Sequence, residues 1–193
     1  ESPDPADPWA YIGYWGDHQI IYLQKLLELS NNFHPGKLES LLNREIFTFA
    51  NVPYRIKSYE EIVNNPKDTI RFDAAEEKKI LEKIDRLGSD GKIVRQSGDG
   101  PLRTNLAEKI LVPLLAKLTN FIPEAGIWLN TQRPEWNDAN NALVGNGTSM
   151  VTLYYMRRYV QFCRSLFRQS PETKFELHLP VTNLLKDIQE LFD

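Results

Sequence analysis

The stretch SMVTLYYMRRYVQFCRSLFRQ, residues 149–169, decides the fold class of this chain. Aliphatic and aromatic side chains recur on most sides of it, and neither glycine nor proline interrupts it. Such a run is far longer than an ordinary strand, so it predicts a long helix packed into a core. Ser170 and Pro171 mark its end, because the residue before a proline is disfavoured in the helical conformation.

The N-terminal half carries three further helix signals. Residues 17–32, DHQIIYLQKLLELSNN, open near Asp17, and their apolar positions cover too wide an arc for a surface helix. We therefore expect this helix to be largely buried. A second helix is predicted over residues 36–47, and a capping box formed by Ser58 and Glu61 predicts a short third one.

The centre of the chain predicts two more helices around a loop. Residues 73–88 have a helix start at Asp73, a stop at Gly88 and a charge pattern typical of a solvated outer face. Residues 89–102 are rich in glycine and predict turns or a hairpin that projects from the domain. Residues 103–122 are strongly apolar and helical, and Pro113 is predicted to bend this helix or to divide it in two.

The C-terminal part predicts a strand and a last helix. Residues 174–179, KFELHL, alternate like a strand, and residues 180–193 form a short amphipathic helix. The fold class is therefore mainly all-α, with roughly five to seven helices, long loops and a small β-hairpin. We expect residues 1–193 to form a single domain.

Composition excludes several classes of function. The net charge of −3 arises from 23 basic and 26 acidic residues mixed along the chain, so nucleic acid is a poor partner. No apolar run has the length of a membrane span, and no leader is visible, so we expect no membrane partner and a cytoplasmic location. The single cysteine, Cys163, cannot form an internal disulfide, and three separated histidines give no metal spacing. We therefore expect no cofactor and no metal.

The stretch RPEWNDANNALVGNG, residues 133–147, combines a tryptophan, two carboxylates and several carboxamides with little aliphatic bulk. Flat aromatic faces stack on a pyranose while amides and carboxylates bind its hydroxyls, so this composition indicates a sugar site. The alternative is that the tryptophans fill gaps between helix ends, and on burial alone the two interpretations stand about even. All four tryptophans fall into two groups: Trp9 with Trp15, and Trp128 with Trp136.

Asp138 is the candidate general acid. Burial beside Trp136 disfavours the charged form, which is what an acid that must stay protonated near neutral pH requires. Glu135 lies three residues earlier, on the same face if a helix starts at Pro134, although carboxylates at a helix start often do no more than favour the dipole. Asp17 is equally compatible with a helix cap and with binding of sugar hydroxyls.

Residues 145–150, GNGTSM, place a flexible loop before a helix N-terminus, which can hold an anion through backbone N–H groups. The loop lacks the lysine of a phosphate-binding P-loop, so a tight turn is the simpler interpretation. A bound phosphate would indicate phosphorolysis, and water alone would indicate hydrolysis. Cys163 has no evident histidine partner, and no G-x-S-x-G motif is present, so a nucleophilic Ser or Cys is not supported.

Residues 134–141, PEWNDANN, resemble the Trp-Asn-Asp and Trp-Met-Asp-Ala segments of carbohydrate-active enzymes with an (α/α)6 toroid, namely cellobiose-phosphorylase-like enzymes and the glucosidase domain of glycogen-debranching enzymes. Residues 14–19, YWGDHQ, are similar in placement to the aromatic, Asp-containing helix start that holds the sugar in subsite −1 of those enzymes. The resemblance implies that Asp138 is the general acid. It implies that the sugar is bound by Trp15, Asp17, Trp128, Arg133, Glu135, Trp136 and Asn137.

The chain departs from these enzymes in its helix number. A complete toroid needs about twelve helices and at least roughly 200 residues at typical lengths. We therefore expect a fragment of a larger glycosidase-like protein, with the remainder of the parent polypeptide as a partner and an oligosaccharide or polysaccharide as substrate. The second carboxylate of an inverting pair would come from elsewhere, because Glu135 is too near Asp138. A non-catalytic carbohydrate-binding module and a plain interaction domain are the alternatives.

Overall fold

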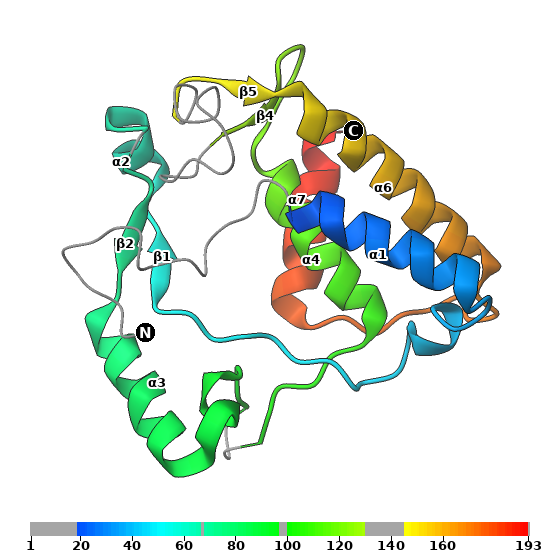
Figure 1. Ribbon diagram of the computed structural model, residues 1–193. Coiled ribbons are helices and arrows are strands. Elements are labelled where there is room, and N and C mark those ends of the chain that lie inside the picture. Colours follow the sequence, from blue (N-terminus) through cyan, green and yellow to red (C-terminus); the bar gives the residue numbers. More distant parts are fainter. Residues whose placement is uncertain (1–18, 67, 97–99, 130–144, 193) are drawn as a thin grey trace. The chain divides into compact units, whose positions relative to one another are not determined.

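The computed structural model describes residues 19–66, 68–96, 100–129 and 145–192 (Figure 1). Within these residues the fold is mainly helical, with six α-helices, two short 3-10 helices and two small β-sheets. This confirms the predicted helical class. The described residues show no (α/α)6 toroid, so that finer part of the prediction stays untested. None of the described helices is long and apolar enough to cross a membrane.

The chain divides into two compact units. Of the described residues, the larger unit contains 19–49, 94–96, 100–127 and 149–192, and the smaller contains 50–66, 68–93, 128–129 and 145–148. The larger unit holds four helices: α1 (Gln19–Phe33), α4 (Leu106–Leu118), α6 (Met150–Gln169) and α7 (Leu179–Phe192). Helix α1 packs on α6, and α4 packs on α7 (Figure 1).

Helix α6 confirms the prediction made from residues 149–169. Ser149 caps its start by accepting a hydrogen bond from the backbone N–H of Thr152, and it ends at Gln169 before Ser170. Its buried face carries Tyr159, whose hydroxyl donates to the carbonyl of Ile110 on α4 at 2.7 Å. The core of the larger unit forms around this face, with Ile20 and Leu27 of α1 and Ile110 and Leu114 of α4.

Helix α4 runs without a break from Leu106 to Leu118 through Pro113. The prediction that this proline divides the helix is therefore wrong. A proline inside a helix loses one hydrogen bond. Packing outweighs that loss here, because Ile110, Leu114 and Leu115 on either side of Pro113 are all buried.

Helix α1 is only partly buried, which corrects the expectation from its wide apolar arc. Ile20, Gln24 and Leu27 face the core, whereas Leu26 and Leu29 are 65% and 52% exposed. The physical reason is that α1 packs on α6 with one face, and the apolar residues on its opposite face stay exposed.

Two predicted elements of the larger unit do not form. Residues 36–47 contain only the 3-10 helix η3 (Glu39–Leu41), because Gly36 has a left-handed φ of 80° and Phe47 pairs in extended conformation with Thr104. Residues 174–178 are not assigned to a strand. Their polar groups bind side chains of α4 and its cap instead of a neighbouring strand.

The smaller unit confirms both central helix signals. Helix α2 (Tyr59–Asn64) begins with the predicted capping box, in which the side chains of Ser58 and Glu61 each bind the other's backbone N–H. Helix α3 (Ala74–Leu87) is capped by Asp73 and ends at Gly88, which has a φ of 64°. Strand β1 (Tyr54–Ile56) pairs antiparallel with β2 (Ile70–Phe72).

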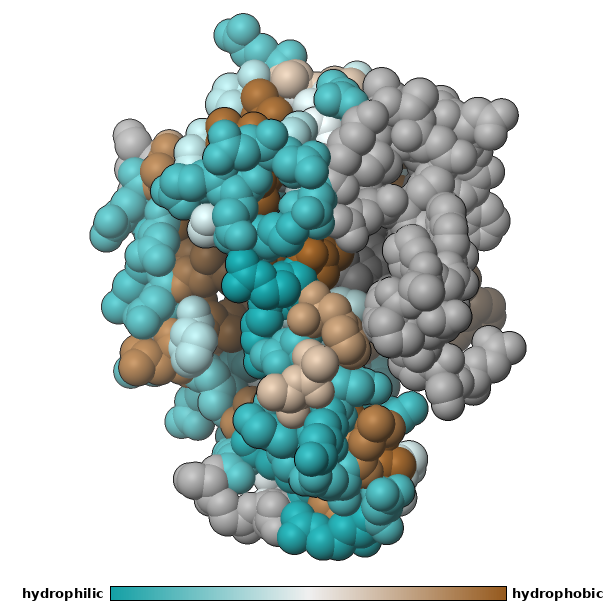
Figure 2. Space-filling view, turned by 90° about the vertical axis from the view of Figure 1, so that its left-hand side faces the viewer, coloured by the Kyte–Doolittle hydropathy of each residue, from teal (hydrophilic) through white to brown (hydrophobic). Residues whose placement is uncertain are grey.

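The outer face of α3 is solvated, as its charge pattern predicts. Ile80 is the buried residue of this helix, and Figure 2 shows mainly hydrophilic side chains on the side where α2, β2 and α3 lie in Figure 1. The 3-10 helix η4 (Gly88–Lys92) turns back onto α3. Gly91 makes this close approach, since a Cβ added there would lie 2.7 Å from the Cα of Ile84.

The glycine-rich stretch after η4 folds back on itself. Arg95 pairs with Pro101 in an antiparallel bridge, and Leu102 N–H donates to the carbonyl of Val94 at 2.8 Å. This agrees with the predicted hairpin. Further along, β3 (Phe121–Ile122), β4 (Gly126–Trp128) and β5 (Thr148–Ser149) form a three-stranded sheet in that order.

Candidate functional site

The predicted sugar motif is inserted in the chain directly after β4. Leu129 follows β4 and is buried; its backbone N–H donates to the carbonyl of Gly147 at 3.0 Å, and its carbonyl accepts from Gly145 N–H at 2.8 Å. The indole N–H of Trp128 donates to the carbonyl of Gly145 at 3.3 Å. Leu129 and Gly145, the described residues on either side of the motif in the sequence, are therefore joined by a backbone hydrogen bond.

Gly145 fits this closure because of its backbone conformation. Its φ is 76°, in the left-handed region that glycine adopts without strain, and it opens a turn with Asn146. The prediction of a tight turn is confirmed here. The N–H of Gly145 is already bound to Leu129, so it is not free to hold an anion as the alternative interpretation requires.

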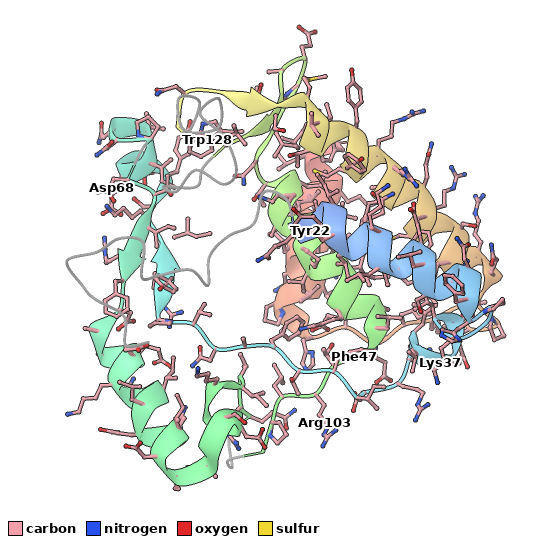
Figure 3. All side chains as sticks on the ribbon, in the orientation of Figure 1. Tyr22, Lys37, Phe47, Asp68, Arg103 and Trp128 are labelled. Carbon is pink, nitrogen blue, oxygen red and sulfur yellow. The ribbon has the colours of Figure 1, made fainter. Side chains whose placement is uncertain are left out.

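Trp128 is the one predicted site residue that lies within the described part of the chain (Figure 3). Its side chain is half-buried, and its indole N–H is used by Gly145, so only the ring face remains for stacking. The other predicted site residues lie outside the described residues: Trp15, Asp17, Arg133, Glu135, Trp136, Asn137 and the proposed acid Asp138.

The described residues contain a polar pair that the sequence did not reveal. Glu108, in the first turn of α4, is 1% exposed and binds His178 at two points. One carboxylate oxygen accepts from the backbone N–H of His178 at 2.6 Å, and the other lies 2.9 Å from its Nδ1. The two residues are 70 positions apart in the sequence, so no local pattern links them.

Asn105, the N-cap of α4, completes this arrangement. Its side-chain oxygen accepts from the backbone N–H of Glu108 at 2.9 Å, while its amide donates to the carbonyl of Glu176 at 2.7 Å. The start of α4 thus holds the extended segment that leads into α7. The Asn-x-x-Glu spacing of a capping motif was the signal that could have marked Glu108.

A small polar pocket of about 160 Å³ adjoins this pair. Its walls are Glu45, Thr104, Asn105, Glu176, Leu177 and His178. A carboxylate that binds Nδ1 of a histidine fixes the orientation of the ring, an arrangement used in both catalytic and structural sites. Both oxygens of Glu108 are occupied by the segment before α7, so its position is explained by anchoring that segment.

A second, apolar groove of about 620 Å³ lies in the larger unit, between α1, α4 and residues 38–49. Lys109 is the charged residue in its wall; its ammonium donates to the carbonyl of Thr48 and lies 4.1 Å from the ring centre of Phe49. Burial lowers the pKa of this lysine. The groove is too apolar for a sugar, whose hydroxyls need several polar partners.

Cys163 and metal ligands add no chemistry in the described part of the chain. The Cys163 thiol is buried, and this burial raises its pKa to about 12, so it stays protonated at neutral pH. Among the residues described, no group of three or more His, Cys, Asp or Glu side chains is placed to hold a metal ion. A nucleophilic cysteine is therefore not supported by the structure either.

No protein-family model matches the sequence, and no curated protein is significantly similar to it.

Proposed function

We propose that this chain is a segment of a carbohydrate-active enzyme that cleaves glycosidic bonds by an inverting mechanism, with Asp138 as the general acid. The observation that supports the proposal is the closure between Leu129 and Gly145, the two described residues that flank the Trp-Asn-Asp segment in the sequence. Binding and catalytic residues are commonly carried by loops that a rigid scaffold positions. The residue types of the motif are those that a sugar site requires.

Each residue of the proposed site has a role that follows from its chemistry. Trp136, with Trp15 and the ring face of Trp128, stacks on the sugar. Arg133, Glu135, Asn137 and Asp17 bind its hydroxyls. Asp138 protonates the leaving oxygen, while a second carboxylate from another part of the parent protein activates water across a gap of about 6.5–9.5 Å. In phosphorolysis, a bound phosphate would attack the sugar directly in place of that water.

The remainder of the proposed (α/α)6 ring would come from the parent polypeptide. The helical character of the described residues is consistent with part of such a ring. Sugar binding at the Trp-Asn-Asp segment is the part of the proposal that this chain can test by itself.

The test is a tryptophan-fluorescence titration of this chain with gluco-oligosaccharides, with and without phosphate. We expect a saturable change in the native chain, its loss in Trp136→Ala, and its retention in Asp138→Asn, which keeps the shape of the acid. In the complete parent enzyme, Asp138→Asn should abolish turnover. A folded chain that shows no response, or a parent enzyme in which Asp138→Asn turns over normally, contradicts the proposal.

A non-catalytic carbohydrate-binding or interaction module is the second candidate. Trp128 favours the interaction module, because its N–H is satisfied by Gly145 and its side chain is half-buried, as in a packing tryptophan. Trp128→Phe separates stacking by the ring from the structural hydrogen bond, because phenylalanine keeps a flat ring and loses the indole N–H. Sugar binding with no turnover by the parent protein would establish the module in place of the enzyme.

A further inference from the structure

Helix α1 carries a row of apolar side chains that point away from its own core. Tyr22, Leu26, Leu29 and Phe33 are 50%, 65%, 52% and 76% exposed, and we call them the α1 stripe (Tyr22 is labelled in Figure 3). Their spacing of three and four residues places them on one face of the helix. Scattered exposed apolar residues are ordinary, whereas a contiguous row marks an interaction surface.

The orientation of α1 is fixed by its contacts with α6. Glu28 accepts two hydrogen bonds from the guanidinium of Arg158, at 2.8 and 2.7 Å, and Lys25 lies 5.5 Å from the ring centre of Tyr155. Ile20 and Leu27 are buried in the core at the same time. The helix therefore cannot rotate to cover the α1 stripe without breaking these interactions.

The stripe continues into the apolar groove of the same unit. Leu26 belongs to the stripe and also lines the groove, together with Leu23 and Leu27. The stripe belongs to the apolar arc of α1 that the sequence predicts to be buried. A partner that packs on the stripe would bury this part of the arc.

The α1 stripe is symmetric in sequence about the point between Leu27 and Glu28. Aromatic residues stand at its two ends, and leucines stand at its two inner positions. If two copies of α1 meet antiparallel across a two-fold axis at this point, Tyr22 faces Phe33 of the second copy and Leu26 faces Leu29. Self-complementarity of this kind is what an isologous interface requires, and the spacing matches the apolar seam of a coiled coil.

Charges beside the α1 stripe do not oppose this pairing. Lys25, which borders the stripe, would lie opposite Ser30 of the second copy, so like charges do not meet. Glu28 is already paired with Arg158 on the other side of the helix. The flanking residues thus allow the approach of a second α1.

We propose that the partner of the α1 stripe is a second copy of this chain, and that two α1 helices pack antiparallel in a two-fold homodimer. This interface does not depend on the sugar-binding proposal. One pair of helices buries less than the roughly 800 Å² per partner of a standard interface. We therefore expect a weak dimer, and a concentration range around the micromolar is the one to search.

The test is sedimentation velocity of the chain at concentrations from roughly 5 to 500 µM, a range that covers micromolar dissociation constants. We expect a shift from monomer to dimer as the concentration rises. Leu26→Glu with Leu29→Glu should weaken the dimer by roughly a hundredfold or more, because it places four carboxylates in one apolar seam. The control is Leu81→Glu on α3, an exposed leucine of 50% exposure that should leave the dimer unchanged.

Disulfide trapping tests the antiparallel register. Tagged Leu26→Cys and untagged Leu29→Cys are mixed and oxidised, while the buried Cys163 stays out of the reaction. We expect a disulfide between the two variants in preference to one within either variant alone. Disulfides that form mainly within each variant would overturn the antiparallel pairing. A chain that stays monomeric at every concentration would overturn the dimer and assign the stripe to another occupant, such as a helix of the parent polypeptide.

Discussion

Replacing Glu108 by alanine should destabilise the chain by about 3 kcal/mol, and the estimate can be worked from its contacts. The largest part comes from the backbone N–H of His178, which loses its acceptor at 2.6 Å; an unsatisfied buried donor costs about 1–3 kcal/mol. The imidazole contact adds about 1 kcal/mol or less, because the side chain of His178 is 35% exposed and solvent screens it. The cavity left by the removed side chain adds about 1 kcal/mol.

Two matched variants divide this energy. Glu108→Gln keeps an oxygen that can accept from the His178 N–H, so we expect a loss of only about 1 kcal/mol. His178→Ala removes the ring and keeps the backbone bond, so it should cost about the same. Urea unfolding followed by circular dichroism gives the free energies of unfolding. Hydrogen exchange should place the added opening of Glu108→Ala in the segment before α7 and in α7 itself.

The anchoring role of Glu108 is refuted if Glu108→Ala costs less than about 1 kcal/mol, the size of a single exposed interaction. It is equally refuted if Glu108→Gln is as harmful as Glu108→Ala. In that case the charge of the carboxylate, and with it the imidazole contact, would outweigh the backbone bond. Faster exchange spread evenly over α1 and α6 would also contradict a local role.

Three further predictions concern other contacts. Gly91→Ala should destabilise the smaller unit by more than about 2 kcal/mol in urea unfolding, because the new Cβ would clash with the backbone of α3. The control is Gly100→Ala, where a new Cβ has no atom within contact distance. Lys109→Met should change the pH dependence of stability, because burial lowers the pKa of Lys109 below its ordinary 10.5. The native chain therefore gains stability as pH rises from the lowered pKa to 10.5. Thermal melts of the variant at several pH values should lack this rise. Asn51→Ala should make stability less sensitive to acid, because the Asn51 hydrogen bond lowers the pKa of Glu76. The stability that this bond contributes is present above about pH 4.5 and is lost as pH falls through the lowered pKa. Equal midpoints of acid unfolding for the native chain and the variant would contradict this.

Signals confined to a few neighbouring residues allowed correct prediction of several elements. The capping box at Ser58 and Glu61, the stop at Gly88 and the end of α6 at Ser170 all depend on hydrogen bonds within one turn of the chain. These interactions form whatever the rest of the protein does. Local patterns therefore identified α2, α3 and α6 correctly.

Elements that depend on distant partners were predicted less well. Phe47 is extended because it pairs with Thr104, and residues 174–178 are held by the cap of α4 instead of by a strand. The partial exposure of α1 depends on which elements surround it. The site predicted around Trp136 from composition lies outside the described residues and stays a prediction. The Glu108–His178 pair could not be predicted from the sequence, because only the fold brings its two members together.

The closure at Leu129 and Gly145 makes the segment between them separable from its scaffold. Because these two flanking residues meet through a backbone hydrogen bond, a short glycine-rich bridge could replace residues 130–144 without pulling the sheet apart. By the same geometry a different segment could be inserted between the same two residues. Evolution could therefore have exchanged residues 130–144 while leaving the described helices unchanged.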